Sequence, residues 1–229
     1  MNSAKIILLI LSNLILISII YQYINDQKLL KTVTKNYRGT RTERLMVLKL
    51  LKFGIPSKAI FHDLYLKKGG ANYCQIDLVV ATKVGILVFE IKKLNGWIFG
   101  LENQTHWTQV LGYGKYKYRF YNPILQNEKH IVDLKNQLSQ FNEVPFYSVI
   151  VVFGNCSFRN LEYVPHNTYL VKSSGAIEVV KKILEQNDPT KYLNKREIVD
   201  LLNSAVLNGE SDEIKSTHIN NIKRNFRNY

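Results

Sequence analysis

The chain has 229 residues, enough for one domain with a substantial core and extensions at its ends. Its formal charge of +13 and its isoelectric point near 9.6 favour an anionic partner, either nucleic acid or the cytoplasmic face of a membrane. Two cysteines, Cys74 and Cys156, exclude a disulfide-stapled scaffold, and their spacing is not that of a zinc finger.

The first element is an apolar segment, residues 6–20, followed by Tyr21 and Tyr23. Counted through Tyr23 it reaches the lower length limit of a transmembrane helix, and the tyrosines suit a headgroup-level aromatic belt. We predict an uncleaved anchor over residues 1–24. A cleaved signal peptide is the alternative, because the segment is N-terminal and Lys5 precedes it, although no small-x-small cleavage pattern follows.

A basic linker is expected over residues 25–38. Positive residues after the apolar segment outnumber Lys5 and the amino terminus before it, so the positive-inside bias places the main domain in the cytoplasm. The expected localisation is the cell membrane, with a single pass. The residues that carry this bias are Lys28, Lys31, Lys35, Arg38 and Arg41.

A helix is expected from Thr40 to about Phe53, ended by Gly54. Glu43 falls on its apolar stripe, four residues before Val47, so its carboxylate faces inward. Two interpretations remain open for Glu43. It either meets an internal partner such as a metal, or it completes a capping box by bonding back to the Thr40 amide.

Two β-like runs, residues 73–81 and 85–93, are joined by a short turn and form the most informative part of the sequence. Glu90 and Lys92 share one face of their strand, and Asp77 lies beside Glu90 if the two runs pair as a hairpin. Two carboxylates converging with a lysine are the groups needed to hold Mg²⁺ and position an attacking water. A surface hairpin with a solvated salt bridge is the alternative.

The other elements follow from apolar patterning and turn residues. Gln126 and His130 share one helical face; Gln126 can also serve as a cap, and a lone histidine is more often a core or surface residue than a ligand. The expected elements are a strand at 59–66, short antiparallel strands over 95–109, a strand at 116–123, a helix from Ile124 to Phe141, a buried strand at 147–153, helices at 176–186 and 194–207, and a polar basic tail.

The run from Tyr113 to Tyr121 interleaves basic and aromatic residues. Such a surface can track a nucleic-acid backbone while its aromatic rings stack on bases. An ordinary exposed strand with one aromatic face explains the run nearly as well.

Together these motifs resemble the nuclease-related domain (NERD) family, a branch of the PD-(D/E)xK nuclease superfamily. The resemblance covers about residues 37 to 156. One departure is that the family's usual Gly-x-x-Gly-Glu start has Thr42 before Glu43. The residues that carry the resemblance are Gly39 to Glu43, Gln75 to Asp77, Gly85 to Lys92, Asn95 to Ile98 with Gly100, Trp107, Asn122-Pro123, Gln126-Asn127, His130 and Val149 to Gly154.

The resemblance implies an α/β, restriction-endonuclease-like core over residues 39–156, in which helices flank a mixed central sheet. Residues 157–229 then form a mostly helical C-terminal extension. It also implies that Asp77, Glu90 and the Ile91 carbonyl hold Mg²⁺ (or Mn²⁺). In the same family pattern Lys92 orients the water or stabilises the phosphorane charge, Glu43 sits at the site edge, and Gln126 supports the site.

The expected function is therefore membrane-anchored, Mg²⁺-dependent hydrolysis of phosphodiester bonds, with DNA as the expected nucleic acid. One alternative is a catalytically idle scaffold that binds nucleic acid at the membrane. Another is a basic surface that binds anionic lipid. The intact Asp77, Glu90 and Lys92 set favours the enzyme, because an idle domain has no need to keep buried acids.

Overall fold

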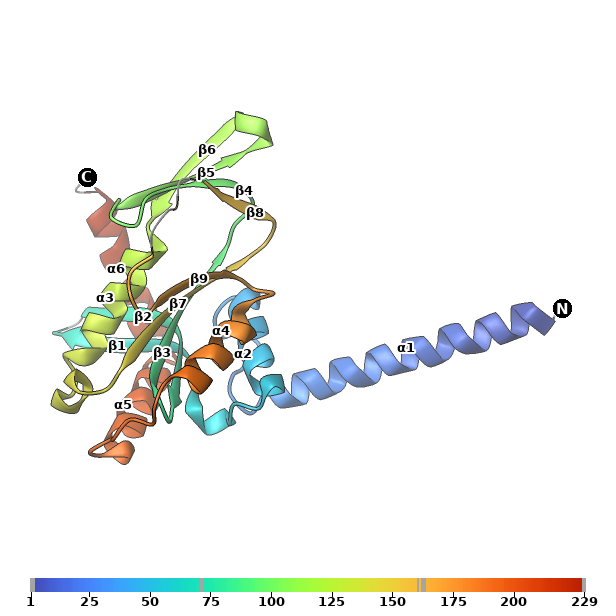
Figure 1. Ribbon diagram of the computed structural model, residues 1–229, viewed down its shortest axis with the longest axis horizontal. Coiled ribbons are helices and arrows are strands. Elements are labelled where there is room, and N and C mark those ends of the chain that lie inside the picture. Colours follow the sequence, from blue (N-terminus) through green and yellow to red (C-terminus); the bar gives the residue numbers. More distant parts are fainter. Residues whose placement is uncertain (1–2, 71, 160, 162–163, 228–229) are drawn as a thin grey trace.

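The structure, a computed structural model, describes residues 3–70, 72–159, 161 and 164–227. A long helix projects from a domain built around two sheets, and the two described ends of the chain lie on opposite sides of that domain (Figure 1). The helices are α1 (Ser3–Leu30), α2 (Arg41–Phe53), α3 (Pro123–Lys135), α4 (Ala176–Gln186), α5 (Lys195–Asn208) and α6 (Asp212–Arg227).

The central sheet has the strand order β1-β2-β3-β7-β9. Its first three strands form an antiparallel meander, whereas β3, β7 and β9 run parallel. The predicted hairpin is confirmed: β2 and β3 are adjacent antiparallel strands. These strands are β1 (Ile60–Gly69), β2 (Asn72–Thr82), β3 (Gly85–Lys93), β7 (Phe146–Phe153) and β9 (Thr168–Lys172).

Helices cover both faces of this sheet, and alternation along each strand divides the core in two. On β3, Leu87 and Phe89 pack with α2 and α4, whereas Ile86 and Val88 pack with α3 and α5. The strands are buried on both faces and so read as nearly continuous apolar runs. The predicted α/β fold, a mixed sheet flanked by helices, is confirmed.

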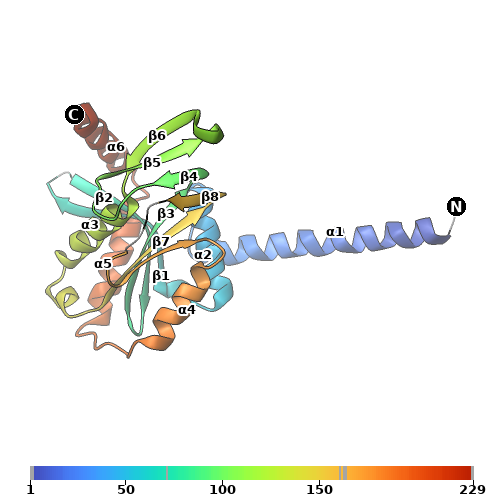
Figure 2. The same ribbon diagram turned by 45° about the horizontal axis from the view of Figure 1, so that its top comes forward.

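A second mixed sheet, with the order β6-β5-β4-β8, forms a separate layer beyond one end of the central sheet (Figure 2). Trp107 anchors it: its ring is buried and its indole N–H donates to the Leu101 carbonyl at 2.9 Å. A side chain at Gly100 would collide with this ring. The strands are β4 (Gly96–Phe99), β5 (His106–Leu111), β6 (Tyr116–Tyr121) and β8 (Cys156–Arg159).

Helix α1 is long and apolar enough to cross a membrane, by length and composition. Its apolar side chains from Ile7 to Ile24 are exposed, and at about 1.5 Å per residue the 24-residue stretch from Ile7 to Leu30 spans about 36 Å. The helix does not stop at residue 24, because it continues through the first part of the expected linker to Leu30, which is buried in the core. Lys52 of α2 pairs with Asp26 of α1 at 2.7 Å.

The helix expected to reach Phe141 was predicted too long, since α3 ends at Lys135. Leu138 is extended, and Gln140 in the following 3₁₀ turn accepts a hydrogen bond from the Asn194 backbone and donates one to Glu197 at 2.7 Å. This contact with the start of α5 favours the turn over a continued helix.

The C-terminal part contains structure that the sequence reading did not predict. Strand β9 adds to the parallel edge of the central sheet, and the residues expected as a polar tail form α6. Helix α6 lies along β2, where a ring nitrogen of His218 is 2.9 Å from the Tyr73 carbonyl. The segment is polar and lacks a broad apolar stripe, so its sequence did not predict a helix. Contacts with the central sheet hold α6 in place.

Candidate active site

The candidate site forms where β2 and β3 separate. Their ladder begins at the pair Leu78–Phe89, and Asp77 lies one step beyond it, in register with Glu90. Instead of continuing the ladder, the Asp77 Oδ2 atom accepts a hydrogen bond from the Ile91 N–H at 2.8 Å. The carboxylate therefore lies against the backbone of β3 beside Glu90.

Glu90 and Lys92 point to the same face of β3, as the alternation predicted. The Lys92 ammonium is 2.6 Å from Glu90 Oε1 and donates to Gln126 Oε1 at 3.0 Å. Gln126 lies in the first turns of α3, whose N-cap Asn122 is completely buried. Asn122 accepts from the Ile124 N–H and donates to carbonyls of the loop before β5, which fixes where α3 begins.

Glu43 enters from the first turn of α2 and is buried. The Thr40 hydroxyl caps the helix by accepting from the Glu43 N–H and donates to Glu43 Oε1 at 2.6 Å. The Glu43 carboxylate thus contacts Thr40, as the capping-box interpretation expects, with this hydroxyl as a hydrogen-bond donor. Its Oε2 atom lies 3.5 Å from Nε2 of His62 on β1.

Gly39 is what permits the approach of Glu43 to His62. Its φ of +57° lies in the left-handed region, and an added Cβ would collide with both the Glu43 carboxylate and the His62 ring. The other ring nitrogen of His62 lies 2.8 Å from the Thr34 hydroxyl. Glu43 is therefore held by two neighbours with its Oε2 atom directed inward.

The electrostatics of the site show an excess of negative charge. Burial, together with the charges of Glu90 and Glu43, raises the pKa of Asp77 well above its usual range, and the Ile91 N–H and Lys92 offset this only in part. Burial also raises the pKa of Glu43, but the neighbouring His62 and Thr40 outweigh it and hold that pKa below its usual value. The charges of three carboxylates therefore influence one another, and the Lys92 ammonium pairs with one of them, Glu90.

Two carboxylate oxygens of this cluster lack a hydrogen-bond partner among the residues that the structure describes, Glu43 Oε2 and Glu90 Oε2. Unpaired buried charge is costly, so such acceptors are typical of a site that a cation completes. Hard carboxylate oxygens are the ligands that Mg²⁺ and Mn²⁺ prefer. The residues present therefore fit a divalent cation.

Of the side chains predicted for the site, Lys92 contacts Glu90 and Gln126 directly. Asp77 and Glu43 lie close enough for the charge of Glu43 to raise the pKa of Asp77. For Ile91 the contact in the cluster is its N–H, and ligation through its carbonyl stays a prediction. The sequence analysis did not identify His62. This residue reaches Glu43 only because β1 packs beside α2 in the folded protein.

His130 and Asn127 of α3 also reach the site's surroundings. His130 Nε2 is 3.5 Å from Glu90 Oε2. Asn127 donates to the Val88 carbonyl and to the Ser148 hydroxyl, both at 2.8 Å, and so ties α3 to β3 and β7. Both residues belong to the sequence motif that follows Pro123. His130 lies four residues after Gln126 and three after Asn127, and this helical spacing was the signal in the sequence.

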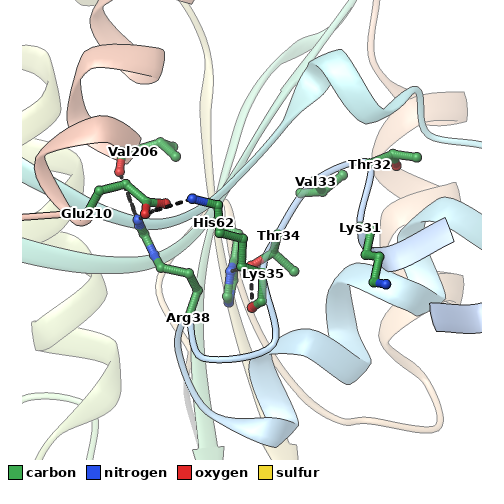
Figure 3. A pocket seen from close by; sticks show the side chains of 9 residues that line it. All are labelled: Lys31, Thr32, Val33, Thr34, Lys35, Arg38, His62, Val206 and Glu210. Carbon is green, nitrogen blue, oxygen red and sulfur yellow. Dashed lines mark hydrogen bonds and ion pairs between the residues drawn. The ribbon is translucent and has the colours of Figure 1, made fainter. Parts of the chain in front are cut away.

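A separate cavity of about 150 Å³ lies behind His62, where α1 joins the domain (Figure 3). Here Arg38 is buried and pairs with Asp63 at 2.8 Å and with Glu210 at 2.9 Å. Lys35 also pairs with Glu210, at 3.0 Å. The residues that line the cavity are Lys31, Thr32, Val33, Thr34, Lys35, Arg38, His62, Val206 and Glu210.

Comparisons with known proteins identify the family of the chain. The family model of the nuclease-related domain matches residues 34–153. An uncharacterised protein of Bacillus anthracis is 29% identical over 170 residues, which cover 74% of this chain and 72% of that protein. No solved structure matches the chain. The matched region holds Asp77, Glu90 and Lys92 and more than half of the chain, and the protein belongs to the nuclease-related domain (NERD) family.

Proposed function

We propose that the protein is a membrane-anchored, metal-dependent nuclease that hydrolyses phosphodiester bonds of DNA. The observation that carries the proposal is the unbalanced cluster of Glu43, Asp77 and Glu90 with Lys92 at its edge. Membership of the family supports a nuclease-like fold. The carboxylate oxygens without a hydrogen-bond partner support a catalytic metal site rather than nucleic-acid binding alone.

Asp77 and Glu90, with Glu43 at the edge, would hold the Mg²⁺ or Mn²⁺ ion. When bound, the ion supplies positive charge that neutralises phosphate oxygens and lowers the pKa of a coordinated water. Asp77 must be ionised for this role, so its raised pKa means that the ion and a proton compete for its carboxylate.

Lys92 is the group placed to act on the substrate. Its ammonium donates to Gln126 and pairs with Glu90, which fixes the end of a flexible side chain at the rim of the carboxylate cluster. From there it can donate to the attacking water or to a phosphate oxygen that gains negative charge. Gln126 is a positioning residue, because it contacts Lys92 rather than the reacting atoms.

The hairpin of β5 and β6 supports nucleic acid as the substrate. Residues 106–121 contain Lys115, Lys117 and Arg119 and lack Asp and Glu, and Tyr116 and Tyr118 are exposed on the same strand. Strand β6 leads through Asn122 directly into α3, which carries Gln126. A nucleic acid lying along this hairpin would therefore be guided toward the carboxylate cluster, with its phosphates paired by the basic residues.

The membrane part of the proposal comes from α1. Its exposed apolar surface suits a bilayer, and basic residues follow it, so we place the domain on the cytoplasmic side of the cell membrane. Full-length protein should fractionate with membranes, and deletion of residues 1–24 should release it. A soluble mature chain that starts after residue 20 would contradict the anchor.

The activity is tested with the full-length protein in detergent micelles, on circular DNA and on RNA, with Mg²⁺ or with chelator. We expect cleavage of DNA that chelator stops and that Lys92→Ala abolishes. Lys93→Ala is the matched control, because Lys93 is exposed on the opposite face of the same strand. Unchanged cleavage by folded Lys92→Ala would overturn the assignment.

The same assay includes the idle-scaffold alternative. If the wild type cleaves neither nucleic acid with any divalent cation, yet binds DNA in a salt-sensitive manner, the protein is a tethered binder. If Arg119→Ala lowers the salt dependence of DNA binding by about one phosphate contact, the hairpin is part of the binding surface.

A further inference from the structure

A second group of potential metal ligands lies beside the candidate active site, between β2 and α3. Cys74 belongs to β2, and His130 and Asp133 lie three residues apart on α3, so both face the sheet. One ligand atom from each residue lies within 4.8 Å of the others, and all three side chains are buried. The group shares no residue with the carboxylate cluster.

His130 is the observation that points to a ligand. Only 7% of the His130 surface is exposed. Within the described part of the chain, neither of its ring nitrogens has a hydrogen-bond partner. A buried imidazole normally satisfies at least one nitrogen, since an unmade hydrogen bond costs about 1–3 kcal/mol. One nitrogen of this ring lies at the Cys74–Asp133 group, and Nε2 is 3.5 Å from Glu90 Oε2.

The chemistry of the three residues identifies the class of ion. A thiolate, an imidazole and a carboxylate form a mixed sulfur, nitrogen and oxygen set, which suits Zn²⁺ and is foreign to Mg²⁺. Zn²⁺ bonds of about 2.0–2.3 Å place tetrahedral ligands about 3.3–3.8 Å apart, so the present group needs only small side-chain movements to close. We propose that Cys74, His130 and Asp133 form a Zn²⁺ site that fastens β2 to α3.

Two features of the free protein must change when Zn²⁺ binds. Burial, and then the neighbouring Asp133, raises the pKa of Cys74 to about 12, so the free residue is a thiol and loses its proton to solvent as the zinc–sulfur bond forms. The Lys68 ammonium lies 2.8 Å from Asp133 Oδ2 and competes with the ion. The Lys68 side chain is 30% exposed, so it can withdraw into water.

Zinc binding at His130 would also affect Glu90, because the two side chains lie close together. A zinc-bound histidine usually donates its second ring N–H to a carboxylate or carbonyl, which fixes both the tautomer and the ring. If Nδ1 of His130 binds the ion, Glu90 Oε2, which lies 3.5 Å from His130 Nε2, is available as that carboxylate. Zinc would therefore hold the strand that carries Asp77 and the helix that carries Gln126 in one arrangement, without itself entering the reaction.

The test uses Co²⁺ as a coloured substitute for Zn²⁺, added to the reduced full-length protein in detergent micelles. A Co²⁺–thiolate bond gives a near-ultraviolet charge-transfer band that oxygen and nitrogen ligands do not give. We expect this band in the wild type at one equivalent, and its bleaching by Zn²⁺. Cys74→Ser should lose the band, whereas Cys156→Ser, which replaces the other buried cysteine, should keep it.

Further variants separate this site from the carboxylate cluster. Asp77→Asn should keep the band even where metal-dependent cleavage is lost, so failure of the nuclease proposal leaves the zinc proposal standing. Asp133→Asn should weaken Co²⁺ binding at least about tenfold, and Lys68→Met should strengthen it because the competing ammonium is gone. Absence of the band in reduced wild type, or its persistence in Cys74→Ser, would overturn the proposal.

Discussion

Two clusters of charged side chains lie close together in this protein. Successive residues of β1, His62 and Asp63, belong to one cluster each. His62 faces Glu43 in the candidate active site, whereas Asp63 faces Arg38 beneath the end of α1. In the second cluster the guanidinium of Arg38 donates to the Asp63 carboxylate and carbonyl at 2.8 and 2.6 Å, and Gln75 donates to Asp63 Oδ1 at 2.9 Å. Asp63 even adopts a φ of +56°, outside the usual region for its residue type.

The two clusters differ in how far their charges are matched. Each Asp63 carboxylate oxygen has a donor, and Glu210 receives Arg38 and Lys35. In the other cluster, Glu43 and Glu90 each leave one oxygen unpartnered within the described chain, and Asp77 has a strongly raised pKa. Matched buried charges serve the fold, while unmatched ones that persist at cost are typical of a functional site.

The largest effect expected from this contrast is on catalysis. Glu90→Gln or Lys92→Ala should lower the rate of DNA cleavage by at least roughly 10²–10³-fold, because the first removes a charged ligand of the ion and the second removes the ammonium that acts on developing charge. The double variant should lose little more than either single variant, since the two residues act as one unit. Single-turnover rates measure this, and additive losses would show that the residues act separately.

The next effect is on stability, in the matched cluster. Arg38→Met leaves the buried Asp63 without its cation, which should cost about 3–5 kcal/mol. For a domain of this size the melting temperature should fall by at least about 6 °C. Arg41→Met, at an exposed position, is the control. A wild-type melting temperature in Arg38→Met would mean that the pair does not hold the linker to β1.

A smaller effect of opposite sign is expected in the unmatched cluster. The folded pKa of Asp77 is raised, so ionisation of Asp77 destabilises the metal-free fold progressively as the pH rises above the unfolded value of 3.8. Asp77→Asn should therefore stabilise the metal-free protein, on the order of 1 kcal/mol, and more at neutral than at acid pH. Thermal unfolding in chelator measures this, and a destabilised variant at neutral pH would contradict it.

The smallest effect is expected at Glu210, which is one-third exposed. Hydrogen bonds from Lys35 and Tyr37 lower its pKa to about 2, so its stabilising contribution is present above pH 4.5 and is lost as the pH falls toward 2. Glu210→Gln should remove that part of the acid dependence, worth no more than about 1 kcal/mol because water screens the pair. An unchanged acid limb of the stability curve would show that other groups dominate it.

The sequence predicted the centre of the site because short-range rules govern it. Alternation along β3 places Glu90 and Lys92 on one face, and the short turn sets the register that brings Asp77 beside them. Spacing on α3 brought Gln126 and His130 to one side. These relations need only the geometry of one strand pair or one helix.

The residues that the sequence did not predict depend on contacts between distant segments. His62 gains its place from β1 packing beside α2, and Cys74 meets His130 and Asp133 only after α3 crosses the sheet. The end of α3 is set by Gln140 bonding to the start of α5, 54 residues later. Tertiary contacts of this kind override local propensity and leave no periodic signal.

The most direct measurement of the central contrast is a Mn²⁺ titration followed by electron paramagnetic resonance of the free ion. It uses full-length protein in detergent micelles, with the Cys74→Ser background to remove the thiolate site. The account predicts that Glu210→Gln binds Mn²⁺ like its parent, whereas Asp77→Asn and Glu90→Gln weaken binding at least about tenfold, or 1.4 kcal/mol. Unchanged Mn²⁺ affinity in both Asp77→Asn and Glu90→Gln would contradict it.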